Sequence, residues 1–566
     1  MPSQFSNRNF LTAFALLILF NTLVLGYYHN RFWWPPDDGV YAHTAERMLN
    51  GEVLNKDVEE IHTGYIHFID VAAFALFGVK FVSLRYPLVL AAFLQSCLVF
   101  LIIARRNVLI ALVAAATATA FGVIQYLNPQ PSWYCVLFAT AIAFFLTYFP
   151  ERKWTIVVVG LLVGLVFFFR QITGVFVAMS VVTYLLAEKK DSAAGRDTWL
   201  ARGILAVMLA GTILYVRAAT NASGLGLFGL WPIALLVQAI LITRTRTRRV
   251  LEVALQLAIG FVAASLPILA YHVAHGSLRT FVDDTMLRAV AIQQLPYLKL
   301  ARFIDQQTLA LSDVVAFRNF HEVVNGIFWF VLPLAGLVTG ALTITRFAKQ
   351  RSTTEVGALP ILAVFYGLVA IFQQIPIYLF YTLPLMTAAL FWLALQWRRR
   401  TLFVLTTLAI LFSAIAIHYD AGQPITRLLR GIIMGERVAL VPSTGLDRVG
   451  LWIEPETLKT YREAVGVIKS NSRPDETIFA LPYNPEFYFL TERKNAFRFW
   501  NTAVGIRPGQ EEQHVFQVLE NTPPRIVVIA PNDRNNTAVS ERISAYVRKR
   551  YSLLRTVGPF EIYRLP

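Results

Sequence analysis

Long apolar segments separated by short polar turns fill roughly the first 419 residues of the chain. An apolar helix of about 20 residues crosses a hydrocarbon core of about 30 Å, so these segments predict about thirteen membrane spans. Two somewhat short spans are expected in the run 154–187, because Arg170-Gln171 interrupts it at the outer face. The remaining expected spans are 10–27, 84–104, 108–124, 133–149, 199–216, 227–242, 250–271, 324–345, 357–375, 377–397 and 402–418.

The segment 33–78 departs from this pattern, because it mixes short apolar stretches with many acids and histidines. Pro35-Pro36 is expected to end one element, and Asp37-Asp38 to open the next. Apolar positions over 40–49 then recur on one helical face. A second apolar stretch, 65–77, is too short to cross a bilayer. We predict two short helices that lie at the membrane surface, with carboxylates at the start of the first and between the two.

From about residue 420 onward, polar residues become frequent, and helix-like stretches alternate with strand-like ones. Amphipathic periodicity predicts helices over 456–470 and 510–519, and short apolar runs predict buried strands over 477–481 and 525–529. This order is typical of a small α/β domain. We therefore expect a transmembrane domain over 1–419 and an extracytoplasmic α/β domain over 420–566, the latter without a catalytic carboxylate.

Composition agrees with a polytopic α-helical membrane protein. The 566 residues are 56% hydrophobic and only 15% charged, whereas soluble proteins carry about 25% charged residues. The net charge of +16 does not indicate nucleic-acid binding, because the basic residues lie in short clusters between apolar segments, as expected for cytoplasmic loops. These clusters are Arg105-Arg106, Arg152-Lys153, Lys189-Lys190, 244–249, 346–351 and 398–400.

Placing every basic cluster in the cytoplasm fixes the expected topology. The N-terminus is then inside, the C-terminus is outside, and the two large outer loops are 28–83 and 272–323. The first apolar segment lacks a convincing cleavage site, so we expect it to be a retained span. Arg288, in the second loop, is expected to be an ordinary surface charge. The only cysteines, Cys97 and Cys135, lie in apolar segments and form no disulfide framework.

Candidate chemistry concentrates in the first outer loop, at Asp37, Asp38, Glu60 and His62. A carboxylate can serve as a general base, and Asp37 and Asp38 are equally eligible on the bare sequence. Either aspartate could instead cap the helix that starts there, and Glu60 could be a solvated loop charge. A divalent ion, if there is one, would be held by Asp37, Asp38 or Glu60, and the sequence requires none.

Three features of this loop resemble a known family: Asp37-Asp38-Gly39-Val40-Tyr41 followed by a short helix, an acid at Glu60, and a second helix that closes at Phe77-Gly78. Together they resemble the first outer loop of C-type (GT-C) glycosyltransferases. The nearest members are the bacterial aminoarabinose transferases that act on lipid A and the protein O-mannosyltransferases. Two departures stand out. Asp38 replaces the usual glutamate, and His62-Thr63-Gly64 stands where many relatives have Lys-Pro-Pro.

The resemblance implies a GT-C membrane glycosyltransferase that moves a sugar from a polyprenyl-phosphate donor to an acceptor hydroxyl by direct displacement. Asp37 would be the base, and Asp38 and Glu60 would orient it or contact the sugar. The lysine that contacts the donor phosphate in relatives is absent, unless His62 takes its place. The remaining donor-binding candidates, all at expected outer ends of spans, are Arg85, Arg170, Gln171 and Tyr378.

The same resemblance places the chain in a bacterial inner (cell) membrane, with the C-terminal domain periplasmic or extracellular. Its expected partners are the lipid-linked donor, membrane lipids and an acceptor that is a glycan, a lipid or a protein. Three other functions stay open. A flippase of lipid-linked sugars predicts charges within spans and repeated halves. An O-antigen ligase or polymerase would place its key residues in the later outer loop, and a receptor or scaffold would act through the α/β region.

Overall fold

The computed structural model describes residues 8–187, 197–288, 302–317, 320–417 and 440–566. Two compact units make up the chain. Unit 1 consists of Met1–Tyr28, Leu88–Pro267 and Leu298–Arg437, and unit 2 of His29–Pro87, Ile268–Tyr297 and Val438–Pro566. The first outer loop and the C-terminal region therefore belong to one unit. The expected domain boundary near residue 420 lies outside the described residues.

All the apolar segments that the sequence predicts to be spans are helical, and the protein is a polytopic α-helical membrane protein. Ten helices in the described residues are long and apolar enough to cross a membrane. Three shorter apolar helices, Lys153–Phe169, Gln171–Leu186 and Ala358–Phe372, coincide with the other three predicted spans. The ten longer helices are Arg8–Tyr28, Phe81–Ala104, Val108–Gln125, Pro131–Tyr148, Trp199–Ala219, Ala222–Ile242, Thr247–Ala274, Gly326–Gln350, Pro376–Ala394 and Arg399–Ile417.

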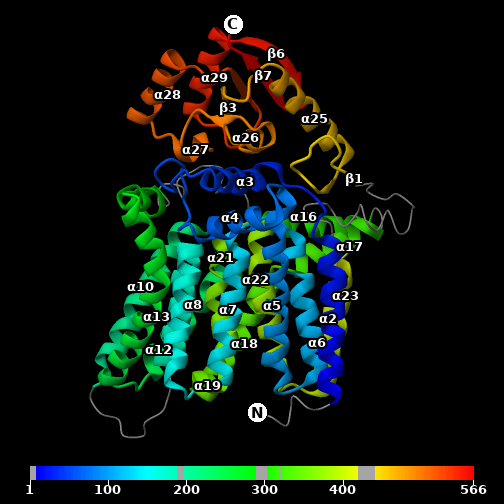
Figure 1. The fold of residues 1–566 in the computed structure, drawn as a ribbon. Helices are drawn as coiled ribbons and strands as arrows, with labels where there is room; N and C mark the ends of the chain where they lie inside the picture. The colour runs from blue at the N-terminus through cyan, green and yellow to red at the C-terminus, as the bar shows by residue number, and fades with distance from the viewer. Residues whose placement is uncertain (1–7, 188–196, 289–301, 318–319, 418–439) are drawn as a thin grey trace. The chain divides into compact units, whose positions relative to one another are not determined.

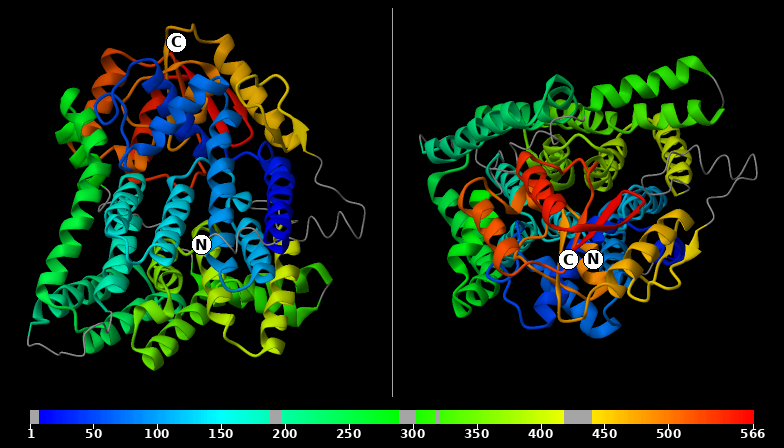
Figure 2. Two further views of the ribbon diagram at one scale, coloured as in Figure 1. Left: turned by 60° about the horizontal axis from the view of Figure 1, so that its bottom comes forward. Right: turned by 90° about the horizontal axis from the view of Figure 1, so that it is seen from above.

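The spans of unit 1 run side by side (Figure 1), and Figure 2 shows them tilted and from above. Packing contacts join α7 to α8, α8 to α9, and α20 to α22. The elements of this region are α2 (Arg8–Tyr28), α5 (Arg85–Ala104), α6 (Val108–Ala120), η2 (Val123–Gln125), α7 (Pro131–Tyr148), α8 (Lys153–Phe169), α9 (Gln171–Leu186), α10 (Trp199–Ala219), α11 (Ala222–Gly224), η3 (Leu225–Gly229), α12 (Leu230–Ile242), α13 (Thr247–Ala274), α16 (Phe303–Ala316), α17 (Phe320–Val331), α18 (Leu334–Gln350), α19 (Thr353–Val356), α20 (Ala358–Tyr366), α21 (Val369–Phe372), α22 (Pro376–Ala394) and α23 (Arg399–Ile417).

Turns that the sequence places on one side of the membrane meet at one end of unit 1. Arg170, the extended residue between α8 and α9, donates a hydrogen bond from Nη2 to the Tyr378 hydroxyl at 3.2 Å and one from Nη1 to Ser132. These residues come from three turns that are all expected outside. Arg105, from a turn expected inside, donates to the carbonyl of Thr147 near the inner end of α7. These contacts bring the starts of α7 and α22 to the junction of α8 and α9, and the other end of α7 to the end of α5.

The direction of insertion gives a first testable prediction. We expect a reporter fused after Pro566 to lie in the outer compartment, and one inserted within 244–249 to lie in the cytoplasm. Paired alkaline phosphatase and fluorescent-protein fusions measure this directly. The opposite pattern for both fusions would invert every site assignment made from the charge distribution.

Unit 2 contains a five-stranded mixed sheet with strand order β4-β3-β5-β7-β6. Strand β3 pairs in parallel with β4 and β5, and β7 pairs antiparallel with β5 and β6. The elements of this unit are α3 (Pro35–Leu49), α4 (Tyr65–Phe77), η1 (Phe81–Leu84), α14 (Leu278–Val282), the π-helical turn η4 (Asp283–Arg288), β1 (Val441–Pro442), β2 (Trp452–Ile453), α25 (Pro455–Ser470), β3 (Thr477–Leu481), α26 (Glu486–Thr491), β4 (Lys494–Asn495), α27 (Thr502–Gly505), α28 (Gln510–Asn521), β5 (Ile526–Ile529), α29 (Ala538–Arg550), β6 (Ser552–Val557) and β7 (Phe560–Arg564).

The predicted strands and helices of the C-terminal region are confirmed as β3, β5, α25 and α28, within one to two residues at their ends. Residues of β3 and β5, such as Phe479 and Val527, form the buried core with one face of α28 and α29. The hairpin of β6 and β7 was not predicted. Strand β6 lies at the sheet edge and is largely exposed, so it lacks a clear apolar alternation.

The two helices predicted in the first outer loop are present as α3 and α4, and the second has the predicted bounds. The prediction that Pro35-Pro36 ends a preceding element is wrong, because both prolines lie in the first turn of α3. Proline is tolerated there, since the first backbone N–H groups of a helix have no intrahelical acceptor. Asp37 and Asp38 consequently lie in the first turn, where the helix dipole favours negative charge.

Candidate active site

Asp38 and Arg85 form a buried ion pair within unit 2. An Nη2 of Arg85 lies 3.1 Å from Oδ2 of Asp38, and both side chains are at most 2% exposed. Arg85 also donates to the carbonyls of Arg31 and Phe32, each at 2.7 Å. Burial raises the pKa of Asp38 to about 6, although the Arg85 charge acts in the opposite direction. Arg85 therefore ties the chain before α3 to the first turn of that helix.

The hydrogen bond from Arg85 to Phe32 stabilises an unfavourable backbone conformation at Phe32. Phe32 has a φ of 60°, in the left-handed region that costs a non-glycine residue on the order of 1 kcal/mol. Its carbonyl accepts from Arg85, and its backbone N–H donates to the carbonyl of Trp452 at 2.9 Å. These two bonds offset the local strain and fix the path by which the chain enters α3.

Asp37 differs from its neighbour in both exposure and partner. It is partly exposed, whereas Asp38 is buried. The Tyr483 hydroxyl donates a hydrogen bond to Oδ1 of Asp37 at 2.8 Å. Tyr483 is half-buried, and its pKa lies well above its usual value, because desolvation and the Asp37 charge both disfavour its ionisation. Tyr483 therefore stays a donor at neutral pH, and Asp37 is the aspartate of the pair that solvent reaches.

Gly39 allows α26 to approach α3 closely enough to place Tyr483 on Asp37. A Cβ at Gly39 would lie 2.5 Å from the backbone nitrogen of Glu486 and 2.8 Å from its Cα. Backbone atoms cannot rotate out of the way as a flexible side chain could. The absence of a side chain at Gly39 is therefore required for this helix-to-helix contact.

We expect Gly39→Ala to lower the free energy of unfolding by about 1–3 kcal/mol, through overpacking against α26. Thermal unfolding of the purified variant in detergent measures the change. Gly466→Ala is the matched control, because this glycine of α25 has no atom within 4 Å of a built Cβ and alanine is the better helix former. Equal melting temperatures for wild type and Gly39→Ala would contradict the close contact.

Glu486 is a buried carboxyl group next to this contact. Its Oε1 accepts a hydrogen bond from the Tyr461 hydroxyl at 2.9 Å, and the residue is fully buried. Burial raises the pKa of Glu486 to about 8, from an ordinary value of 4.5. The folded protein therefore holds a proton on Glu486 at neutral pH, whereas the unfolded chain releases it.

This difference predicts a pH-dependent stability. Because the unfolded chain loses the proton first, the stability contributed by protonated Glu486 is lost as pH rises from about 4.5 to about 8. Glu486→Gln cannot ionise and keeps an oxygen for Tyr461, so its advantage over wild type should grow to on the order of 5 kcal/mol above pH 8. Melting curves of both proteins between pH 5 and 9 test this. If the stability difference between the two proteins is the same at every pH in this range, Glu486 is not protonated in the folded protein.

Glu60 is the centre of a second cluster, with two histidines. Nδ1 of His62 lies 2.7 Å from Oε1 of Glu60, and Nε2 of the buried His67 hydrogen-bonds Oε2. Burial alone would raise the pKa of Glu60, but His67 and His62 together hold it well below its usual range. Asp70, on the same helix as His67, is fully buried, and burial followed by the Glu60 charge raises its pKa well above normal. Glu60 is thus the ionised member of this group.

Aromatic side chains connect the two acidic clusters. The rings of Tyr483 and Trp500 are 5.6 Å apart, and the Trp500 indole donates to the carbonyl of Glu59 at 3.0 Å. On the other side, the Tyr41 ring of α3 stacks on the ring of His67 at 5.7 Å. Two aromatic side chains, Tyr483 and Trp500, therefore link Asp37 to the backbone of Glu59, the residue before Glu60.

Arg288 does not lie at the surface. It is buried, and its ion pair with Glu59 holds the acidic segment of the first outer loop. Its side chain is 6% exposed, and its Nη1 lies 2.9 Å from Oε1 of Glu59. Its Nε lies 3.2 Å from Oδ1 of Asp284, and Arg498 pairs with the other oxygen of that aspartate. The expectation of an ordinary surface charge was wrong, because four carboxylates around Arg288, those of Glu59, Asp283, Asp284 and Glu511, offset the cost of burying it.

The other predicted donor-binding residues form a cluster in unit 1. Arg170 is 8% exposed, and its guanidinium carbon lies 5.1 Å from the centre of the Tyr378 ring. Gln171 is the first residue of α9. Two separate groups thus contain the predicted site residues: Arg170, Gln171 and Tyr378 in unit 1, and Asp37, Asp38, Glu60, His62 and Arg85 in unit 2.

Within the described residues, no three His, Cys, Asp or Glu side chains are arranged to hold a metal ion. The candidate ligands already have other partners: Asp37 has Tyr483, Asp38 has Arg85, and Glu60 has two histidines.

Sequence reasoning missed Tyr483, Trp500 and His67 as parts of this site. Tyr483 and Trp500 lie more than 440 positions after the residues they contact, and no short motif marks them. A signal for His67 was present, since a histidine and an aspartate three residues apart share one helical face.

No family model and no curated protein matches the chain. Among solved structures, the chain is similar to ArnT from Cupriavidus metallidurans bound to undecaprenyl phosphate, with 12% identity and a TM-score of 0.41. It is also similar to the apo state of ArnT from the same organism, with 14% identity and a TM-score of 0.38. Both alignments cover 98% of this chain and 97% of the other.

Proposed function

We propose that the chain is a membrane glycosyltransferase of the C type, which moves a sugar from a polyprenyl-phosphate donor to an acceptor hydroxyl. The observation that carries the proposal is the contrast between two adjacent aspartates. Asp38 is buried and paired with Arg85, whereas Asp37 is partly exposed and oriented by Tyr483. The sequence resemblance of this loop to the family supports the same assignment.

Asp37 has the properties of a general base. It lies in the first turn of α3, where backbone N–H groups favour its ionised form. The Tyr483 hydroxyl stabilises the carboxylate further and fixes its orientation, at some cost in basicity. In the reaction, the acceptor oxygen attacks the anomeric carbon and its proton passes to Asp37. The bond from that carbon to the phosphate oxygen breaks, and the phosphate leaves with the electron pair.

The leaving phosphate needs cationic or hydrogen-bonding partners more than it needs a proton. We propose two candidate groups for this role, each within its own unit: Arg170 with Tyr378, and His62 beside Glu60. Arg85 takes a different role in this proposal, because its Nη atoms already donate to Asp38 and to two backbone carbonyls. We assign it to positioning the aspartate pair rather than to contact with the donor.

Reconstitution tests the proposed reaction against its main rival. The purified chain is placed in proteoliposomes that contain a polyprenyl-phosphate sugar with a radiolabelled sugar, together with candidate acceptors. A glycosyltransferase releases polyprenyl phosphate and labels the acceptor. A flippase moves the intact lipid to the other leaflet, so relocation of the donor without cleavage would replace the proposal.

A further inference from the structure

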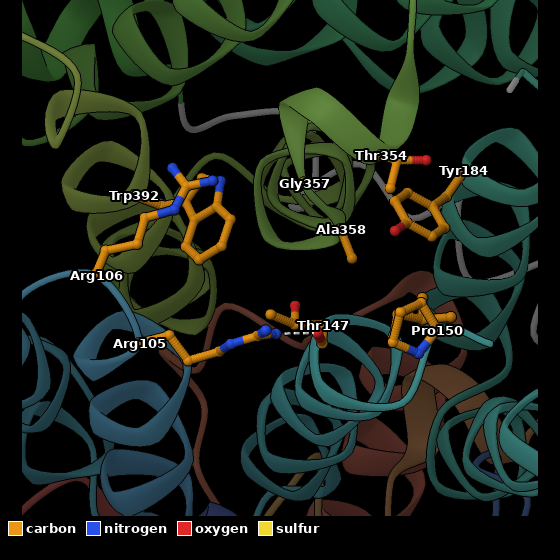
Figure 3. A pocket seen from close by; sticks show the side chains of 10 residues that line it. Arg105, Arg106, Thr147, Pro150, Tyr184, Thr354, Gly357, Ala358 and Trp392 are labelled. Atoms are coloured by element: carbon orange, nitrogen blue, oxygen red, sulfur yellow. Dashed lines mark hydrogen bonds between the residues drawn. The ribbon is translucent and has the colours of Figure 1, made fainter. Parts of the chain in front are cut away.

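A cavity lies in unit 1, at the end that carries the basic turns, and its volume is about 290 Å³ (Figure 3). The turn after α5, the ends of α7, α9 and α22, and the start of α20 form its walls. It contains none of the candidate active-site residues. The polar and aromatic side chains that line it are Arg105, Arg106, Thr147, Tyr184, Thr354 and Trp392.

Two arginines give this cavity a net positive charge. The guanidinium carbon of Arg106 lies 3.9 Å from the centre of the Trp392 ring, and that of Arg105 lies 4.8 Å from the Tyr148 ring. Arg105 also donates to the carbonyl of Thr147. Within the described residues, no carboxylate forms an ion pair with Arg105 or Arg106, although the charge of Glu355 acts on Arg106. The rings and the carbonyl hold the two guanidiniums in place without taking up their charge.

The aromatic wall of the cavity is rigid. The Trp392 indole donates to the carbonyl of Val356 at 2.9 Å, and the tryptophan is only 6% exposed. Gly357 has a φ of 99°, and a Cβ there would come within 2.5 Å of the indole nitrogen. Glycine at this turn therefore lets Trp392 pack directly on the backbone. The backbone therefore fixes the ring on which Arg106 packs.

We propose that this cavity binds a phosphate group, supplied either by an anionic lipid headgroup or by free phosphate. Guanidinium groups match the geometry of phosphate oxygens, and the hydroxyl-bearing side chains Tyr184 and Thr354 lie on another wall. Leu146, Pro150 and Ala358 supply an apolar border. The volume is at the lower end of ordinary ligand pockets, so it accommodates a headgroup rather than a whole lipid.

Native mass spectrometry of the purified full-length chain tests this site. Dissociation constants are measured for phosphatidylglycerol, for a neutral glycolipid with the same acyl chains, and for inorganic phosphate. Preference for phosphatidylglycerol over the neutral lipid, with no competition from millimolar phosphate, identifies the lipid headgroup as the source. Competition by inorganic phosphate identifies a site for free phosphate. Equal binding of the two lipids, with no phosphate binding, overturns the proposal.

Variants locate the binding within the cavity. Arg105→Gln/Arg106→Gln should weaken binding roughly tenfold or more, because two charge-assisted contacts are lost. Arg398→Gln/Arg399→Gln is the matched control, since it removes the same charge from equally exposed arginines that do not line the cavity, and it should change binding less than about twofold. Ala358→Leu keeps both arginines but fills the cavity, and should also abolish binding. Equal weakening in the control, or unchanged binding in Ala358→Leu, would overturn the site.

Discussion

Asp37→Asn is expected to lower sugar transfer by a factor of about 10² or more, while leaving the chain inserted and able to bind the lipid donor. Asparagine keeps the size of the side chain and can still accept a hydrogen bond from Tyr483, but it cannot accept the acceptor's proton. The effect should therefore fall on the turnover rate rather than on donor affinity. Transfer from a radiolabelled polyprenyl-phosphate sugar is compared in membranes that contain equal amounts of each protein.

Asp475→Asn is the matched control for this loss. It makes the same chemical change in unit 2 at a side chain that is 77% exposed, and it should leave the rate unchanged. Near-wild-type turnover by Asp37→Asn would move the base elsewhere, first to Asp38 and then to Glu60. An equal loss in both variants would show that the assay reports stability rather than chemistry.

Arg85→Gln should destabilise unit 2 by about 3–5 kcal/mol, the usual cost of breaking a buried ion pair by removing one partner. The change leaves Asp38 buried without its cation, and it removes the bonds that hold the strained turn at Phe32. Thermal unfolding in detergent measures the loss. The control Arg473→Gln, at a side chain 75% exposed, should stay within about 0.5 kcal/mol of wild type.

A double variant separates the charge from the packing. Arg85→Gln/Asp38→Asn removes both charges and keeps hydrogen-bonding groups, so it should recover part of the stability that Arg85→Gln loses. If the double variant is less stable than Arg85→Gln by the full cost of Asp38→Asn alone, the two residues do not interact as an ion pair.

Hydropathy was sufficient to predict the spans, because each apolar helix is encoded by its own local composition. Even the break at Arg170 followed from a charged residue inside an apolar run. The start of α3 was misplaced by two residues, since Pro35-Pro36 can either end an element or open a helix. The edge strand β6 was missed, because its exposed positions carry no periodic apolar signal.

Only the site residues of the first outer loop were predictable from the sequence, and their distant partners were not. Asp37 and Asp38 stood out by composition, but their different roles depend on burial and on partners far away in sequence. Tyr483 is 446 positions from Asp37, and Arg288 is 229 positions from Glu59. Such pairs arise when three separate segments fold into unit 2, and a single sequence carries no local signal for them.

The most direct test compares purified wild type with Asp37→Asn in proteoliposomes that contain a polyprenyl-phosphate sugar and an acceptor. The measured quantity is polyprenyl phosphate formed for each sugar transferred. We predict a ratio near one for wild type and donor cleavage about 10² or more slower for the variant, with donor binding retained. Equal cleavage by the two proteins, or acceptor labelling without release of polyprenyl phosphate, would contradict Asp37 as the base of a lipid-phosphate-dependent transfer.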